Sequence, residues 1–182
     1  MNIISKNTGL SFGYILAAYY ILVNSAVFFS DFTWFAKPHL GIANMVVVLI
    51  LGVSCVWITK RKLGNSITTK EGFSAFFIMI IIGLFVNYFV QFILFNYVNP
   101  EAKAINNQLM IDMAENIARE INAPKEEIAE QIELMKNSAN DNFTIKTLIF
   151  SLTQSVLGAS IAGLLISLIF KNKSEFTTPN AQ

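Results

Sequence analysis

The chain has 182 residues, of which 54% are hydrophobic and 14% are charged. Soluble domains carry about 25% charged residues, so this composition indicates a membrane protein. The net charge of +1 excludes a strongly basic, nucleic-acid-binding surface. The single cysteine, Cys55, excludes an intrachain disulfide and a cysteine zinc cluster, and the single histidine, His39, excludes a multi-histidine metal site.

Four stretches contain no Asp, Glu, Lys or Arg: residues 9–30, 40–59, 73–95 and 147–170. Each can cross the hydrocarbon as a helix, for which about 20 apolar residues suffice, and must be helical there because backbone groups in lipid need partners within the segment. The sequence therefore predicts an all-α fold, an integral membrane four-helix bundle that forms a single membrane domain over residues 1–182. A signal peptide is the alternative for the first stretch, although its apolar region exceeds the usual 7–15 residues or so.

The distribution of basic residues predicts how the chain is oriented. Positive residues in short connections should face the cytoplasm. They gather before the first stretch, between the second and third, and after the fourth, at Lys6, Lys60, Arg61, Lys62, Lys70, Lys171 and Lys173. We therefore expect cytoplasmic N- and C-termini and an extracytoplasmic connection over residues 96–146.

This connection carries nine acidic and five basic residues, a net charge of −4. Helix starts are predicted at Asn99-Pro100-Glu101 and again at 122–127. Apolar residues then recur at helical spacing, at Ile105, Leu109, Met113, Ile117 and Ile121 and at Ile128, Ile132 and Met135. We expect an amphipathic helical hairpin, with an outward extension of the third stretch into the first of its helices as the alternative. The apolar stripes would pack on each other, lie at the membrane–water boundary, or dock a partner or a second copy.

Small residues follow one another every four positions in the last stretch, at Ser155, Ala159, Gly163 and Ser167. A shorter row runs through Gly9, Gly13 and Ala17 in the first stretch. Such rows let helix backbones approach closely. We expect them to serve packing inside the bundle, with self-association through the last helix as the alternative.

Five amide side chains lie inside the four stretches, which contain no Asp, Glu, Lys, Arg or His: Asn24, Asn44, Asn87, Gln91 and Gln154. At one depth they would form a cluster that binds a small polar solute, or that joins helices by hydrogen bonds worth about 0.6 kcal/mol each. The second role is the commoner one. An ion-coupled transporter normally carries an ionisable residue within a span. The four stretches contain no charged residue, which weakens the interpretation that this protein is such a transporter.

No catalytic constellation, metal site or cofactor motif is evident in the sequence. His39 and Asp31 share one short connection, but no nucleophile accompanies them, and an interfacial role for His39 is favoured. There is no glycine loop for phosphate, and Cys55 lies in an apolar stretch. We expect a protein that is not an enzyme and holds no cofactor.

Several features in order resemble a family of uncharacterised bacterial inner-membrane proteins that share a domain of unknown function. They are Gly41-Ile42-Ala43-Asn44, the basic Lys60-Arg61-Lys62 turn, and residues 67–76 with Gly72-Phe73-Ser74-Ala75-Phe76. An acidic helical loop and a final helix rich in small residues follow. The resemblance implies four spans in the bacterial cytoplasmic membrane. It implies no reaction, ligand or partner, so no functional residue is carried over.

The function expected from the sequence is that of a non-enzymatic accessory or self-assembling membrane component. The hairpin stripes and the small-residue row of the last helix would carry the association, with the lipid bilayer, a second copy or another membrane protein as partner. The alternative is a small transporter or channel subunit that uses the amides around Asn87 and Gln91 for a polar solute.

Overall fold

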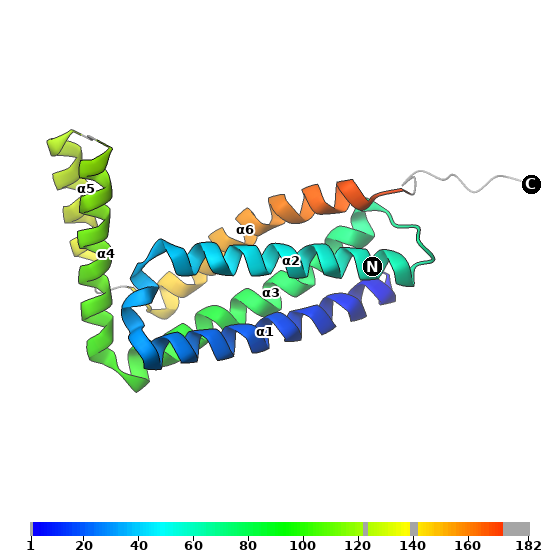
Figure 1. Ribbon diagram of the computed structural model, residues 1–182, viewed down its shortest axis with the longest axis horizontal. Helices are drawn as coiled ribbons and strands as arrows, with labels where there is room; N and C mark the ends of the chain where they lie inside the picture. Colours follow the sequence, from blue (N-terminus) through cyan, green and yellow to red (C-terminus); the bar gives the residue numbers. More distant parts are fainter. Residues whose placement is uncertain (1, 122–123, 139–141, 173–182) are drawn as a thin grey trace, which may run out of the picture. The chain divides into compact units, whose positions relative to one another are not determined.

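The computed structural model describes residues 2–121, 124–138 and 142–172. Within them the chain forms α-helices and no strand, which confirms the all-α fold (Figure 1). The helices are α1 (Ile3–Asp31), α2 (Pro38–Lys62), α3 (Thr69–Ile93), α4 (Pro100–Glu120), α5 (Lys125–Ser138) and α6 (Ile145–Phe170). A short 3-10 helix, η1 (Phe32–Ala36), follows α1, and a short π-helix, η2 (Leu94–Val98), follows α3.

Four of these helical segments are long and apolar enough to cross a membrane: Ile3–Ala36, Pro38–Lys62, Thr69–Val98 and Ile145–Phe170. They contain the four charge-free stretches. The first three segments extend beyond their stretches at both ends, and the fourth extends only at its N-terminal end. Helices α4 and α5 form the connection between α3 and α6, as expected. Lys173, which entered the argument on orientation, lies outside the described residues.

Local capping explains where two helices begin. Thr68 and Glu71 form a capping box: the Glu71 carboxylate accepts from the Thr68 N–H at 3.0 Å, and the Thr68 hydroxyl accepts from the Glu71 N–H at 3.2 Å. Helix α3 therefore starts before the charge-free stretch. Helix α4 begins as predicted, with Pro100 at its start and Asn99 Oδ1 accepting from the Ala102 N–H at 3.2 Å. Residues 122–123 of the second predicted start lie outside the described residues.

The chain divides into two compact units. Unit 1 comprises residues 1–19, 45–86 and 153–182, and unit 2 comprises residues 20–44 and 87–152. Unit 1 contains the fully buried Phe76 of α3, whose ring lies against Gly52 of α2 and Gly163 of α6. A side chain at either glycine would overlap the ring, so the glycines allow three helices to meet around one aromatic residue.

Helix α1 approaches α3 through its own small residues in unit 1. A methyl group on Gly9 would lie 2.6 Å from the Ala75 carbonyl oxygen, and one on Gly13 would lie 2.9 Å from Ile82. Conversely, Leu16 of α1 fills the space over Gly83 of α3. The predicted small-residue row of α1 therefore serves packing within the chain.

Polar contacts close the end of unit 1 that holds the basic turn. The Asn172 side chain accepts from the Ile67 N–H at 3.0 Å and donates to the Asn65 carbonyl at 2.7 Å. The Lys60 ammonium donates to the Phe170 carbonyl at 3.0 Å, at the C-terminus of α6. These bonds fix the turn between α2 and α3 to the last residues of α6.

The core of unit 2 is aromatic. Phe95 of η2 is fully buried and meets three other rings: Phe28 at 5.2 Å, Phe35 at 5.3 Å and Phe143 at 4.1 Å between ring centroids. The first two pairs are edge-to-face and the third is stacked, which are the favoured arrangements. This cluster joins residues from α1, η1, η2 and the turn before α6.

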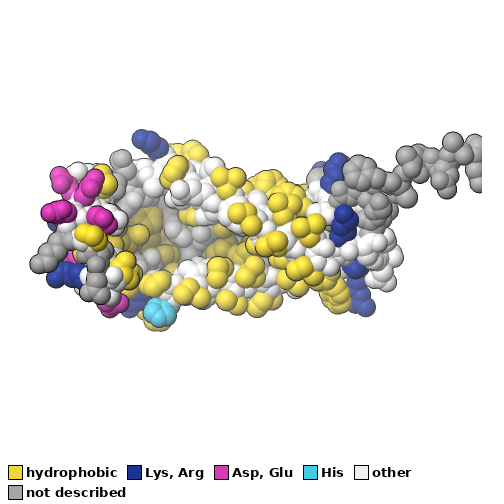
Figure 2. Space-filling view, turned by 90° about the horizontal axis from the view of Figure 1, so that it is seen from above, with side chains coloured by type: hydrophobic (Ala, Val, Ile, Leu, Met, Phe, Trp, Pro, Cys, Tyr) yellow, Lys and Arg dark blue, Asp and Glu magenta, His cyan; other side chains and the backbone are white. Residues whose placement is uncertain are grey.

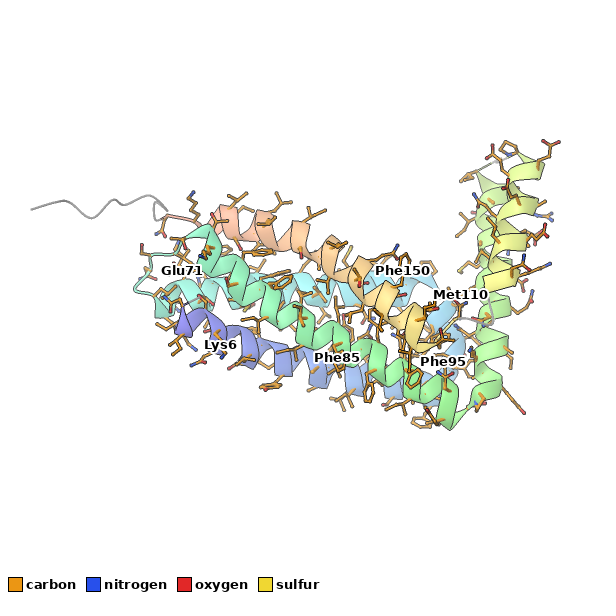
Figure 3. The ribbon with its side chains drawn as sticks, turned by 180° about the vertical axis from the view of Figure 1, so that it is seen from behind. Lys6, Glu71, Phe85, Phe95, Met110 and Phe150 are labelled. Carbon is orange, nitrogen blue, oxygen red and sulfur yellow. The ribbon has the colours of Figure 1, made fainter. Side chains whose placement is uncertain are left out.

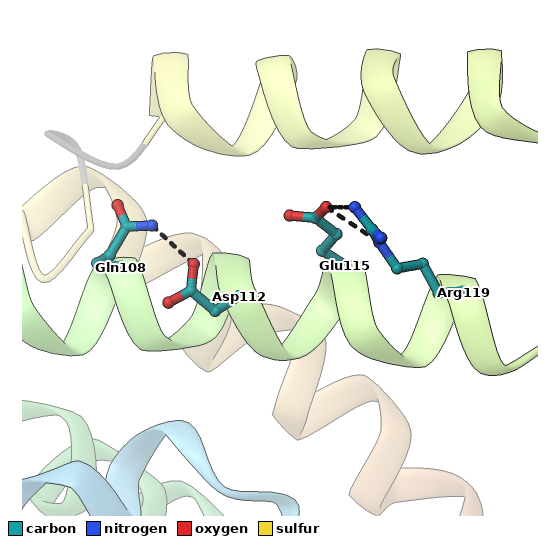
Figure 4. Close-up of polar contacts among 4 residues, drawn as sticks. All are labelled: Gln108, Asp112, Glu115 and Arg119. Atoms are coloured by element: carbon teal, nitrogen blue, oxygen red, sulfur yellow. Dashed lines mark hydrogen bonds and ion pairs between the residues drawn. The ribbon is translucent and has the colours of Figure 1, made fainter.

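Helix α4 packs against α5, η1 and η2 in unit 2, but not through the whole predicted apolar row. Its buried residues are Ala102, Asn106, Asn107 and Ile111, whereas Ile105, Ile117 and Ile121 are about half exposed or more. At 3.6 residues per turn, each step of four residues advances about 40° around the helix, so the row winds away from a single face. Polar pairs Gln108–Asp112 and Glu115–Arg119 follow the helix at the same spacing (Figure 4).

Candidate functional site

Three of the predicted intramembrane amides come together in unit 2. Asn24 of α1 donates from Nδ2 to Asn87 Oδ1 at 2.9 Å, and Gln91 of α3 donates from Nε2 to the same oxygen at 3.1 Å. Asn24 is fully buried and Asn87 is 8% exposed. The amide chain Asn24–Asn87–Gln91 therefore joins α1 to α3 and runs from the interior toward a more accessible side chain.

Gln91 also lines a pocket of about 190 Å³ in unit 2. The polar side chains around this pocket come from α3, α4, the turn before α6, and α6 itself: Tyr88, Gln91, Asn106, Asn142, Thr147 and Ser151. We call this space the amide pocket. It gathers hydrogen-bonding groups without any Asp, Glu, Lys, Arg or His among its described lining residues.

Asn106 is the most unusual of these residues because it is polar, 1% exposed and incompletely bonded. Its Nδ2 reaches Met110 Sδ at 3.8 Å, a weak contact within α4. Its Oδ1 has no hydrogen-bond partner among the described residues. Leaving a buried acceptor unpaired costs about 1–3 kcal/mol, so such a group calls for an explanation.

The turn before α6 is held in place around the pocket by specific contacts. Asn142 donates to Asn107 Oδ1 at 2.9 Å, and Asn96 of η2 donates to the Phe143 carbonyl at 2.9 Å. Phe143 itself adopts φ +59°, a left-handed conformation that is rare for a bulky residue. Such strain persists where surrounding contacts over-determine the backbone. Here the stack on Phe95 and the bond from Asn96 hold Phe143 at the pocket wall.

The other two predicted amides are placed differently. Asn44, near the start of α2, is half-buried and belongs to unit 2, and it makes contacts of its own. Gln154 of α6 is exposed and belongs to unit 1.

The predicted small-residue row of α6 is divided by burial. Gly163 and Ser167 are buried in unit 1, with Gly163 against Phe76 and the Ser167 hydroxyl donating to the Gly163 carbonyl at 2.7 Å. Ser155 and Ala159 are half-buried. Because Gly163 is covered by a ring of the same chain, its surface is not open to a second copy.

Asp31, which shares a short connection with His39, serves as a helix cap in the structure. The Asp31 carboxylate accepts from the Thr33 N–H at 3.0 Å and from its hydroxyl at 2.6 Å, which caps η1. His39 is exposed near the start of α2. Over the described residues, no group of three His, Cys, Asp or Glu side chains could hold a metal ion.

Sequence reasoning found Gln91 but missed Asn106, Asn142 and Tyr88 as its neighbours. Asn106 lies next to Ile105 in the predicted apolar row, and the sequence favoured the isoleucine as the inward-facing residue. The sequence did contain one signal for this site, the pair of adjacent amides Asn106-Asn107. Both are buried on α4, the helix that packs against η1 and η2.

The chain is similar to a known protein family over most of its length. It belongs to the family described as "Protein of unknown function (DUF4199)", which matches residues 11–172. No curated protein and no solved structure matches the chain. The family covers the amide chain and the amide pocket entirely, and it brings no assigned activity to them.

Proposed function

We propose that this family member is a non-enzymatic membrane component that associates, through its α4–α5 hairpin, with a second copy or with another membrane protein. The observation that carries this proposal is the set of large aliphatic side chains exposed on the hairpin, outside the four segments that can span a membrane. Ile105 is 49% exposed, Ile117 50%, Ile121 70% and Leu134 62%.

Helix α5 does not bury the exposed isoleucines of α4. Helix α5 already packs on α4 and still leaves Ile117 and Ile121, one turn apart, open at the end of the helix. Exposed aliphatic groups that are neighbours on a helix favour a protein partner. The hairpin also carries many acidic side chains, visible in Figure 2, which disfavours deep adsorption on an anionic lipid surface.

Light scattering of the protein purified in mild detergent from native membranes tests this proposal. We expect an assembly larger than one chain, which a double variant, Ile117→Glu with Ile121→Glu, converts to the monomer. A matched control adds the same two charges at exposed polar positions, Asn116→Glu with Gln131→Glu, and should leave the assembly intact. A monomeric wild-type protein, or equal masses for both double variants, would contradict the proposal.

A second candidate is a small transporter or channel subunit for a polar solute, supported by the amide chain Asn24–Asn87–Gln91. It predicts flux of neutral solutes into liposomes that contain the protein, and loss of that flux in Asn87→Leu. Gln154→Leu, at an exposed amide of α6, is the matched control. Flux equal to that of empty liposomes over a broad solute panel would exclude it.

We propose that the protein lies in the bacterial cytoplasmic membrane, with both termini in the cytoplasm and the hairpin outside. The basic residues that flank the four charge-free stretches support this orientation.

A further inference from the structure

We propose that the amide pocket binds a small, neutral ring compound that donates a hydrogen bond, from a hydroxyl or N–H group, to Asn106 Oδ1. This inference stands apart from the association proposed above, because neither Ile117 nor Ile121 lines the pocket. It concerns a binding site and does not require that the bound molecule cross a membrane.

The unpaired acceptor defines one end of the ligand. Asn106 is 99% buried by its surroundings, lines the pocket, and leaves Oδ1 unpaired among the described residues. Exchanging the amide oxygen and nitrogen would not remove the problem, since the sulfur of Met110 is a poor partner for either atom. A ligand with a hydrogen-bond donor supplies what the chain does not, and because Oδ1 is itself buried, the Asn106 side chain must turn toward the pocket to accept that bond.

The described part of the lining favours a neutral ligand. No described lining residue carries a charge, and the polar groups are amides and hydroxyls. An ion moved into such a site would lose its hydration without gaining a counter-ion, which is strongly unfavourable. Amides and hydroxyls instead suit a neutral partner that both donates and accepts.

The apolar part of the wall defines the rest of the ligand. Phe35, Phe143, Met110 and Leu148 line the pocket together with the polar groups. Phe143 is fixed by its stack on Phe95 and by the bond from Asn96, so its ring presents a rigid wall. Aromatic and thioether groups favour a flat apolar body. The volume of about 190 Å³ lies below the range of about 300–1,000 Å³ for drug-sized ligands, which indicates a single small ring.

Fluorine NMR of the full chain in detergent, with three single-ring probes, tests this assignment. The probes are 4-fluorophenol, 4-fluoroanisole, which lacks the donor, and 4-fluorobenzoate, which is an anion. We expect saturable broadening of the 4-fluorophenol signal that unlabelled phenol reverses. The anisole should bind about ten-fold more weakly, as the loss of one buried hydrogen bond implies, and the benzoate should not bind. Equal saturable binding of the phenol and the anisole, or broadening no different from that in empty micelles, would overturn the proposal.

Two variants locate the binding and show whether the amide is kept for a ligand. Asn106→Leu should abolish the saturable broadening, whereas Gln108→Leu, at an exposed amide on the same helix, should retain it. Without ligand, Asn106→Leu should raise the melting temperature, because it removes an unpaired buried polar group. A lower melting temperature would show that Asn106 serves the fold, and unchanged phenol binding in that variant would place the ligand elsewhere. The probe comparison on the wild-type chain remains decisive if the variant fails to fold.

Discussion

A single side chain, Phe95, organises the core of unit 2, since it contacts rings from three other segments. We expect Phe95→Ala to lower the free energy of unfolding by about 3–5 kcal/mol, the range for a buried aromatic residue, because three ring contacts lose their partner. Chemical denaturation in detergent, followed by circular dichroism, measures the change.

The control is Phe85→Ala in the same span-capable segment, Thr69–Val98, because Phe85 is 56% exposed; both residues are labelled in Figure 3. It should change the free energy of unfolding far less. Comparable losses for the two variants would mean that the aromatic cluster is not the core that its geometry indicates. The Phe95→Ala variant should also affect Phe143, because the left-handed backbone of Phe143 depends on the ring stack that Phe95 provides.

At the scale of helices, close packing around Phe76 depends on glycine. Gly163 and Gly158 lie on the same helix, α6, but a methyl group on Gly163 would overlap the Phe76 ring, whereas one on Gly158 would meet nothing within 4 Å. We expect Gly163→Ala to lower the free energy of unfolding by about 1–3 kcal/mol through overpacking. Gly158→Ala should leave it unchanged or raise it by up to about 1 kcal/mol, since alanine favours the helix.

Thermal unfolding of the two variants in the same detergent decides this prediction. Phe76→Leu should partly rescue Gly163→Ala, because a smaller side chain returns the missing space. Equal melting temperatures for the two glycine variants would contradict the packing described here. So would a failure of the second change to compensate for the first.

The sequence predicted helices well and side-chain partners poorly, and both outcomes have physical reasons. Charge-free length is a property of the chain itself, so the four span-capable segments and the start of α4 at Asn99-Pro100 followed from the sequence. Burial on α4 depends on what lies across from it. The four-residue row through Ile105 and Ile117 therefore pointed away from the observed core, and Asn106 was overlooked.

The amide chain also shows that sequence position predicts the depth of a side chain better than its partners. Asn24 and Asn87 were expected to share one depth, and the structure joins them at 2.9 Å. Depth alone grouped Asn44 and Gln154 with them, yet Gln154 is exposed and belongs to unit 1. Depth follows from position within a segment, whereas helix rotation is set by packing.

For the whole molecule, the proposed orientation rests on one topological argument. A single span-capable segment, Thr69–Val98, separates the basic turn before α3 from the hairpin after it, so the two connections lie on opposite sides if that segment crosses the membrane once. The Lys60-Arg61-Lys62 run then supports the proposal that the turn faces the cytoplasm. Single-cysteine reporters read this directly, because the only native cysteine, Cys55, is fully buried.

We expect a membrane-impermeant maleimide to label Gln131→Cys, on the exposed surface of α5, in intact cells. It should label Ser66→Cys, in the turn before α3, only after the cells are lysed, and it should not label the wild-type chain in either state. Labelling of both reporters in intact cells would mean that Thr69–Val98 does not cross the membrane. The opposite pattern would show that the basic turn faces outward, in which case the charge of the connections does not set the orientation of this protein.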